Sequence, residues 1–492
     1  MSTLSSMIKM IVLAYVLVIL FPINVIDAKI GVTWGRISST QLVPSMVVDL
    51  LLQNKVEEAR IFNDDDSVIE AFGGSNIGLS IGVSNPKDVN SSTTAIDFIQ
   101  DKIAAYPSTK IRYVVIGSMP ALSTAKYLNE PFDNVVKAIK FMQEALNESG
   151  YGEKIKAVIT NSFSGVLKPN ITKPSDAEFL DDLKEPITEI LDVYKQNDSP
   201  FLIDFFPIAY INAYNIEPNY VFFDNKSSYV IHDNGFIYTN LFEFVHDSFL
   251  SALCKLGANK TKIVVSQIGW PTDGFPGANV VAAERFYKGL LPFSLSNKGT
   301  PLRPGRPIDI YVHSLTDEKQ NPAGIPFTRH WGIFMSNGEP KYNIDLSGQG
   351  RDEIFPNMAK GINRMPSRWC VYNADGKDTE KVMKEFTFAC ANADCTSLAP
   401  GGSCSMLNFR ENVSYAFNMY FQYHFQNESM CKFDGLGQVV VENPSRNGCV
   451  FPVETVKGNK RNKQLAAAYG NKRLHVDAAL FLVLISIFLV LF

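Results

Sequence analysis

Residues 29–345 alternate between short apolar segments and longer segments with helical periodicity. Residues 132–146, for example, place their apolar side chains on one helical face. Eight such strand–helix units in succession predict an α/β fold of the (β/α)8 TIM-barrel class. A doubly wound open sheet is the alternative, but the glycine-rich phosphate loop that follows an early strand in that fold does not occur in the sequence. The predicted strands are residues 30–33, 59–62, 79–83, 113–116, 157–159, 201–205, 263–266 and 308–312.

The N-terminus has the layout of a secretory signal peptide. Lys9 precedes an apolar run, residues 10–21, and Ala28 supplies a small residue for cleavage. A membrane-spanning helix is the alternative, but the run is too short to cross a bilayer comfortably. We therefore predict that residues 1–28 are removed and that Lys29 begins the mature chain.

The C-terminus predicts a lipid anchor. Residues 478–492 are uninterrupted apolar sequence, and they follow a polar stretch, residues 469–477, and the small residues 466–468. Small residues, a polar spacer and an apolar tail form the signal for a glycosylphosphatidylinositol (GPI) anchor, and the tail is removed when the anchor is attached. A tail-anchored helix is the alternative, and further attachment sites lie at Gly458 and Gly470. The predicted parts are a stalk at 454–466, attachment at Ala466 and a removed propeptide at 467–492.

A secreted chain is exposed to N-glycosylation at its Asn-x-Ser/Thr sequons. The sequon at Asn197 is the least favourable, because Pro200 directly follows its Ser199. The predicted glycosylation sites are Asn90, Asn147, Asn170, Asn225, Asn259, Asn412 and Asn427.

Six of the seven cysteines lie between Cys370 and Cys449. In a secreted chain this density predicts three disulfides in a small α+β module, residues 369–453, joined to the barrel by a linker, residues 346–368. A zinc site is the alternative, but the spacings contain no paired C-x-x-C. Cys254 lies apart, in a helical pattern, and is predicted to be a buried core thiol.

The loops that follow barrel strands are where this fold places its chemistry. Several aromatic side chains and one carboxylate fall on these loops, and flat rings at the mouth of a barrel are suited to hold sugar rings. The alternative is that each tryptophan packs its loop onto the barrel. The predicted substrate-binding residues are Trp34, Phe206, Trp270, Glu318 and Trp331.

Four segments of the barrel carry a family resemblance. They are I-G-V-T-W-G at 30–35, Y-V-V-I-G-S-M-P-A-L at 113–122, V-S-Q-I-G-W-P at 265–271 and G-T-P-L-R-P at 299–304. Taken in order along the chain, these segments resemble glycoside hydrolase family 17, the plant endo-β-1,3-glucanases, and the subgroup with a C-terminal module and a lipid anchor. The resemblance implies a TIM barrel that acts on β-1,3-glucan.

The departures from the family pattern fall on its catalytic positions. The family's acid/base glutamate is replaced by Met119 and its nucleophilic glutamate by Gln267. A further cleft glutamate is kept as Glu318, whereas the family's lysine and next glutamate become Asn321 and Thr328. On this resemblance, no catalytic residue is intact.

A retaining glycosidase needs two carboxyl groups about 5–5.5 Å apart, one to donate a proton and one to attack the sugar. A methionine has no proton to give, and losing a general acid alone costs on the order of 10²- to 10⁴-fold in rate. A glutamine is neutral and forms no glycosyl ester. The other carboxylates near the rim that could replace these two groups are Asp204, Asp273, Asp317 and Glu318. Glu318 is the best candidate, but one carboxylate cannot fill both roles.

The C-terminal module resembles carbohydrate-binding module family 43, from W-C-V at 369–371 through P-G-G-S-C at 400–404 and S-Y-A-F-N-M-Y-F-Q at 414–422 to C-V-F-P at 449–452. Spacing alone leaves fifteen disulfide pairings open. The resemblance implies β-1,3-glucan binding and the pairs Cys370–Cys431, Cys390–Cys395 and Cys404–Cys449.

The aromatic residues at 415–423 are candidates for a sugar platform in this module. The candidates are Tyr415, Phe417, Tyr420, Phe421 and Tyr423, and the alternative is that Tyr415, Phe417 and Phe421 form the core face of a helix.

The sequence therefore predicts a β-1,3-glucan (callose)-binding protein without catalytic activity, on the outer face of the plasma membrane and in the cell wall, with a role in cell-wall organisation. The alternatives are an active glucan endo-1,3-β-D-glucosidase or transglycosylase that uses other carboxylates, and a barrel that binds proteins while only the module binds sugar. No cofactor or metal is expected, and a net charge of −4 argues against nucleic acid as a partner.

Overall fold

The computed structural model describes residues 28–38, 41–117, 119–318, 328–350, 356–373, 379–446 and 448–455. The predicted signal peptide, the stalk beyond residue 455, the attachment residue Ala466 and the propeptide lie outside these ranges, as does Asn321. Within them, no helix is both long and apolar enough to span a bilayer.

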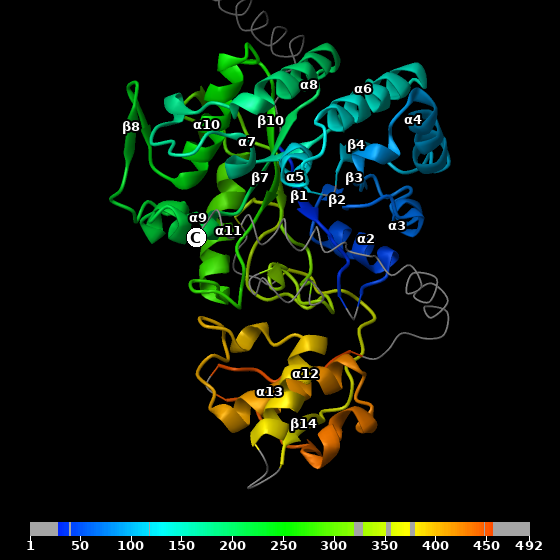
Figure 1. The fold of residues 1–492 in the computed structure, drawn as a ribbon, viewed down its shortest axis with the longest axis vertical. Helices are drawn as coiled ribbons and strands as arrows, with labels where there is room; N and C mark the ends of the chain where they lie inside the picture. The colour runs from blue at the N-terminus through cyan, green and yellow to red at the C-terminus, as the bar shows by residue number, and fades with distance from the viewer. Residues whose placement is uncertain are drawn as a thin grey trace, which may run out of the picture.

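The larger domain is built on a nine-stranded sheet in which every neighbouring pair is parallel. Its edge strands β5 and β6 are separated only by Ile159, so the two edges belong to one stretch of chain and the sheet closes into a barrel (Figure 1). This confirms the TIM-barrel prediction. In spatial order the strands are β5 (Lys156–Val158), β4 (Ile111–Ile116), β3 (Gly78–Val83), β2 (Glu58–Arg60), β1 (Ile30–Thr33), β13 (Ile310–Val312), β10 (Ile263–Ile268), β7 (Phe201–Phe205) and β6 (Thr160–Ser162).

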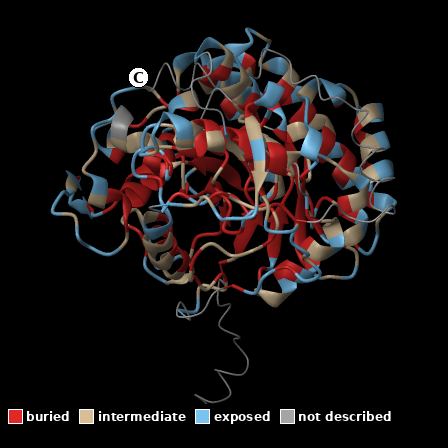
Figure 2. Ribbon diagram, turned by 90° about the horizontal axis from the view of Figure 1, so that it is seen from below, coloured by how far each residue is buried: buried red, intermediate tan, exposed pale blue. Residues whose placement is uncertain are grey.

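Helices pack around the outside of these strands. Buried residues gather in the middle of the molecule and exposed residues at its periphery (Figure 2). Several helices begin at a residue that accepts a hydrogen bond from the first turn, such as Asp65, Ser91 and Asn240. The helices are α2 (Pro44–Gln53), α3 (Asp66–Ala71), α4 (Ser92–Ile99), α5 (Ala121–Tyr127), α6 (Asp133–Glu148), α7 (Phe163–Val166), α8 (Lys184–Asn197), α9 (Pro207–Ala213), α10 (Leu241–Lys255) and α11 (Val280–Leu295).

The prediction for Cys254 was wrong. Helix α10 is buried along almost its whole length, yet Cys254 lies in its last turn and is an exposed free thiol. The periodicity marks a helix, but only the packing decides which part of its last turn is covered.

The C-terminal module lies below the barrel in Figure 1. Strands β14 (Trp369–Tyr372) and β15 (Gly437–Val440) pair antiparallel beside helices α12 (Thr379–Asn392) and α13 (Phe409–Tyr423). Tyr415, Phe417 and Phe421 are buried in its two apolar clusters. The disulfides are Cys370–Cys431, Cys390–Cys395 and Cys404–Cys449, the pairing that the family resemblance implied.

The segment between the two domains is attached to both. Asn357 exchanges hydrogen bonds with Asn54 at the end of α2, and Arg364 forms an ion pair with Glu339. The backbone amide of Met365 donates to the carbonyl of Glu454 in the module. This segment therefore contacts the barrel and the module along its length.

The predicted glycosylation sites lie at the surface. Six of the seven asparagines are exposed, and Asn412 is half-buried at the start of α13. The sequon at Asn197, which the prediction leaves out, is less accessible. Its Ser199 is buried, and the side-chain oxygen of Asn197 accepts a hydrogen bond from Asn147.

Candidate functional site

The candidate site lies at the carboxyl ends of the barrel strands, where β10 carries a bulge. The register of β10 against β7 shifts between Val265 and Gln267, so that Gln267 lies opposite Asp204. Successive side chains of a regular strand point to opposite faces, and a bulge breaks this alternation. Ser266 and Gln267 consequently both reach the same carboxylate.

Asp204 is the centre of a closed network of polar side chains. One carboxylate oxygen accepts from the Gln267 amide at 2.9 Å, and the other accepts from the Ser266 hydroxyl at 2.7 Å. Arg60 lies 3.5 Å from that second oxygen and also donates to the Ser266 carbonyl. Burial lowers the pKa of Arg60, while the charge of Asp204 opposes the shift. The carboxylate is thus fully engaged by neighbours within the barrel.

His313 is held neutral beside this network. Burial, followed by the nearby charge of Arg60, lowers the pKa of His313 to about 3. Its Nδ1 shares a hydrogen bond of 2.9 Å with the Thr33 hydroxyl. A buried imidazole of this kind adds no charge to the site near neutral pH.

Met119 occupies the loop that joins β4 to α5. Gly117, at the start of this loop, has a positive φ of 89°, and its Cβ position would lie 3.0 Å from the Met119 carbonyl. Met119 is half-buried. The loop geometry therefore places a thioether, which neither donates nor accepts a proton, in this part of the cleft.

Phe206 and Trp331 form an edge-to-face pair with ring centroids 5.2 Å apart. His313 lies against both, at 5.4 Å from Phe206 and 5.6 Å from Trp331. Trp331 is 3% exposed, whereas Phe206 is half-buried. Of these two predicted substrate-binding residues, Phe206 presents the larger accessible surface.

The other tryptophans are buried as well. Trp270 is 2% exposed, stacks obliquely on Phe222 and Phe286 and donates its indole N–H to the Gly277 carbonyl. Trp34 is 3% exposed and lies under the Arg36 guanidinium. These contacts are those of side chains that pack loops onto the barrel, the alternative that the sequence left open.

Two parts of the chain match known families. Residues 30–346 match glycosyl hydrolases family 17, and residues 368–438 match the X8 domain. The chain belongs to glycosyl hydrolases family 17. Its second domain is an X8 module, the carbohydrate-binding module family 43 of the sequence resemblance.

Curated relatives and solved structures agree with this assignment. The chain is 36% identical to glucan endo-1,3-beta-glucosidase 8 of Arabidopsis thaliana over 87% of its own length and 89% of the relative. It is 35% identical to glucan endo-1,3-beta-glucosidase 9 of the same plant, over 86% and 89%. Among solved structures, the beta-1,3-glucanase CJP38 of Cryptomeria japonica pollen matches with a TM-score of 0.60 at 30% identity, covering 65% of this chain and 99% of CJP38.

The remaining carboxylates of this family 17 barrel have structural partners. Asp273 accepts four hydrogen bonds, from the Gly274 and Ser403 amides and the Ser397 and Ser403 hydroxyls. Asp317 accepts from Lys341 at 2.5 Å and from a backbone amide at 2.9 Å. Burial opposes the negative charge of Asp317, but Lys341 and His330 lower its pKa overall.

Glu318 is the retained cleft glutamate of the family. It is 6% exposed and packs so closely against Gly35 that a side chain at that position would collide with its carboxylate. Its backbone amide donates to the Arg329 carbonyl at 3.0 Å. Among the described residues, no group of three His, Cys, Asp or Glu side chains has an arrangement that would hold a metal ion.

The X8 module is joined to the barrel through buried charges. Asp394 of the module accepts a hydrogen bond from Arg329 at 3.0 Å and lies 3.2 Å from Nε2 of His330. The other ring nitrogen of His330 lies 3.6 Å from Asp317. All four side chains are largely buried. We call this set, Asp317, Arg329, His330 and Asp394, the junction network.

The junction network keeps His330 protonated. Burial alone would lower the pKa of His330, but Asp394 and Asp317 outweigh it and raise the pKa to about 10. For Asp394, burial is outweighed by His330 and Arg329, which lower its pKa. Lys341 also pairs with Asp317, so three cations and two carboxylates meet at the contact between the domains.

Neither buried network is apparent from the sequence. Arg60, Asp204 and Gln267 lie on three different strands, and Asp394 lies far along the chain from His330. The histidine beside Trp331 and the buried aspartate after α12 are unremarkable in the sequence, and nothing in their spacing marks them as partners.

Proposed function

We propose that this protein binds β-1,3-glucan at the cell surface without cleaving it. The observation that carries the proposal is the contact between Gln267 and Asp204. The side-chain amide of Gln267, at the family's nucleophile position, donates a hydrogen bond to the carboxylate of Asp204, which also neutralises Arg60. Neither group is available to attack a sugar, and Met119 offers no proton.

The other carboxylates near the rim support the same conclusion. Asp273 and Asp317 accept hydrogen bonds that fix the surrounding loops and the module in position. Glu318 alone cannot serve as both acid and nucleophile. A barrel that keeps its scaffold but lacks the reacting pair favours binding of the substrate over stabilisation of the transition state.

Glucan binding is further supported by the relatives and the second domain. The similar proteins are named as glucan endo-1,3-beta-glucosidases, and residues 368–438 form an X8 module. The predicted signal peptide and GPI signal would hold the protein at the outer face of the plasma membrane, beside the cell wall, where such a polymer is found. Phe206 is the most exposed of the predicted substrate-binding residues, so the proposal assigns direct contact with the glucan to Phe206, with Trp331 packed against it.

The test is a paired assay of hydrolysis and binding. Residues 29–459 are purified and mixed with laminarin, a soluble β-1,3-glucan, and both reducing-end release and binding are measured. Binding without release is the expected result. Release that survives Gln267→Ala would mean that another carboxylate does the chemistry, as in the alternative of an active glucosidase or transglycosylase.

A further inference from the structure

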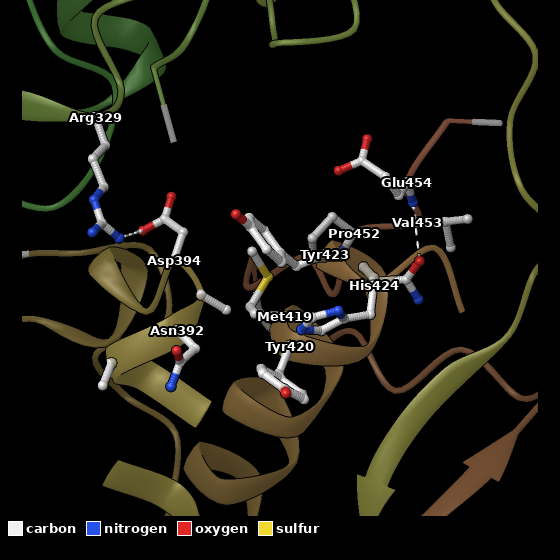
Figure 3. Close-up of a pocket in the computed structure, with 13 residues that line it drawn as sticks. Arg329, Asn392, Asp394, Met419, Tyr420, Tyr423, His424, Pro452, Val453 and Glu454 are labelled. Atoms are coloured by element: carbon white, nitrogen blue, oxygen red, sulfur yellow. Dashed lines mark hydrogen bonds and ion pairs between the residues drawn. The ribbon is translucent and has the colours of Figure 1, made fainter. Parts of the chain in front are cut away.

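A hollow of about 520 Å³ opens where the module meets the barrel (Figure 3). The end of α12, the C-terminal turn of α13 and residues 452–454 line it from the module, and Arg329 lines it from the barrel. Its volume is in the range of small-molecule sites, about 300–1,000 Å³. The two domains thus form one hollow together.

Helix α13 divides its aromatic residues between the module core and this hollow. Phe417 and Phe421 are fully buried in the core, whereas Tyr420 and Tyr423 are half-buried and line the hollow. His424, at the end of the helix, lies with its ring 4.4 Å from Tyr420 and 5.4 Å from Tyr423. Figure 3 shows the three rings together on one wall of the hollow.

The polar groups around the hollow carry little net charge. Arg329 is paired with Asp394, and burial lowers the pKa of His424, which keeps that ring neutral near pH 7. Asn392 and Glu454 add an amide and a carboxylate to the lining. Flat rings beside amide, carboxylate and guanidinium groups suit an uncharged ligand with many hydroxyls, and they offer no concentrated positive charge to a phosphate or a polyanion.

We propose that this hollow binds a segment of β-1,3-glucan and that the barrel completes the site with Arg329. The inference rests on the proposed function for the choice of polymer, but it assigns the binding to the junction and not to the module alone. Arg329 lies two residues from Trp331, a chain distance of at most about 7 Å, and Trp331 packs against Phe206. A glucan held in the hollow would therefore lie near the Phe206–Trp331 pair.

The experiment measures laminarin binding by residues 29–459 with Tyr423→Ala and a matched control, Phe409→Ala. Phe409 is a 46% exposed aromatic residue at the start of the same helix, about 21 Å from Tyr423 along the helix axis. We expect Tyr423→Ala to weaken binding by about tenfold or more, as for a central aromatic contact, and Phe409→Ala to leave it unchanged.

Hydrogen exchange of the unaltered protein tests the contribution of the barrel. Laminarin is expected to slow exchange at both residues 420–424 and residues 328–331. Protection confined to the module, or unchanged binding by Tyr423→Ala, would overturn the composite site while leaving glucan binding in place. Failure of the unaltered protein to bind laminarin would instead overturn the proposed function itself.

Discussion

The barrel and its junction with the module each contain a buried charge network. The first, which we call the floor network, consists of Arg60, Asp204 and Gln267 at the carboxyl ends of the barrel strands. The second is the junction network. In the floor network, Arg60 and Asp204 neutralise each other, and the neutral Gln267 donates a hydrogen bond to Asp204. At the junction, three cations, Arg329, His330 and Lys341, meet the carboxylates of Asp317 and Asp394. The first network lies within one domain, and the second joins two.

The two networks differ in the space that the surrounding side chains leave beside them. Around the floor network the tryptophans are buried, and Asp204 is held by hydrogen bonds from Ser266 and Gln267. Beside the junction network, tyrosines and a histidine line a hollow. Among the described residues, the ligand-sized space therefore lies beside the junction network and not beside the floor network.

Removal of the Asp204 charge from the floor network should have the largest effect on stability. Asp204→Ala leaves Arg60 buried without its carboxylate, so we expect a loss of about 3–5 kcal/mol in the free energy of unfolding. Urea unfolding followed by circular dichroism measures it. The control is Asp182→Ala, which breaks an exposed pair with Lys126 and should cost less than about 1 kcal/mol. Equal losses in the two variants would contradict the role given to Asp204.

Restoring the family's nucleophile alone should also destabilise the barrel. Gln267→Glu places a second carboxylate 2.9 Å from the first with one arginine to serve both, and we expect a loss of about 2–3 kcal/mol. Adding Asp204→Asn returns the network to one negative charge and should recover most of that loss.

The same series sharpens the test of activity. Only the triple variant Met119→Glu, Asp204→Asn, Gln267→Glu supplies two carboxyl groups without the competing Asp204 charge. We expect laminarin hydrolysis to rise above that of the unaltered protein in this variant and not in Gln267→Glu. Hydrolysis by the unaltered protein at the level of the triple variant would show that the floor network is no barrier to catalysis.

A change at the junction should loosen the module without unfolding the barrel. Asp394→Asn removes the charge that faces Arg329 and His330, at a cost of about 2 kcal/mol. Calorimetry is expected to resolve a separate, earlier transition for the module. Glu428→Gln is the matched control, because its partner Arg368 lies in an exposed pair on the module surface. A single unchanged transition would argue that backbone contacts alone hold the domains together.

Over a single pH unit, the smallest expected effect is the pH dependence of the junction. The pKa of His330 is raised to about 10 in the folded chain against about 6.5 unfolded, so its stabilisation is complete below pH 6.5 and is lost as pH rises toward 10. The slope is at most about 1.4 kcal/mol per pH unit. Asp394 acts in the opposite range, because its lowered pKa gives stability that is lost as pH falls below about 4. Thermal unfolding from pH 5 to 10 measures the basic side.

His330→Gln is the control for this dependence. It removes the titrating ring and should flatten the stability profile between pH 6.5 and 10. The groups that face His330 are Asp394 and Asp317 and, through them, Arg329 and Lys341. The same slope with and without the histidine would assign the pH dependence elsewhere.

Much of the fold follows from local chemistry that is readable in the sequence. The predicted strands at 30–33 and 201–205 match β1 and β7, because each is a short and largely apolar run that the barrel buries completely. Six clustered cysteines in a chain with a predicted signal peptide indicated the disulfide module. That residues 119 and 267 carry no carboxylate is equally a property of the sequence, since no fold can supply a proton or a charge that a methionine and a glutamine lack.

The tertiary structure decided which residues meet. Closure of the barrel brings Arg60, Asp204 and Gln267 together from three strands, and docking of the module brings Asp394 to His330. Whether Trp270 is buried and Cys254 exposed depends on what packs over each side chain. Local propensity and periodicity report on neighbours along the chain, whereas the energy of a buried charge depends on partners that only the folded chain brings within a few ångströms.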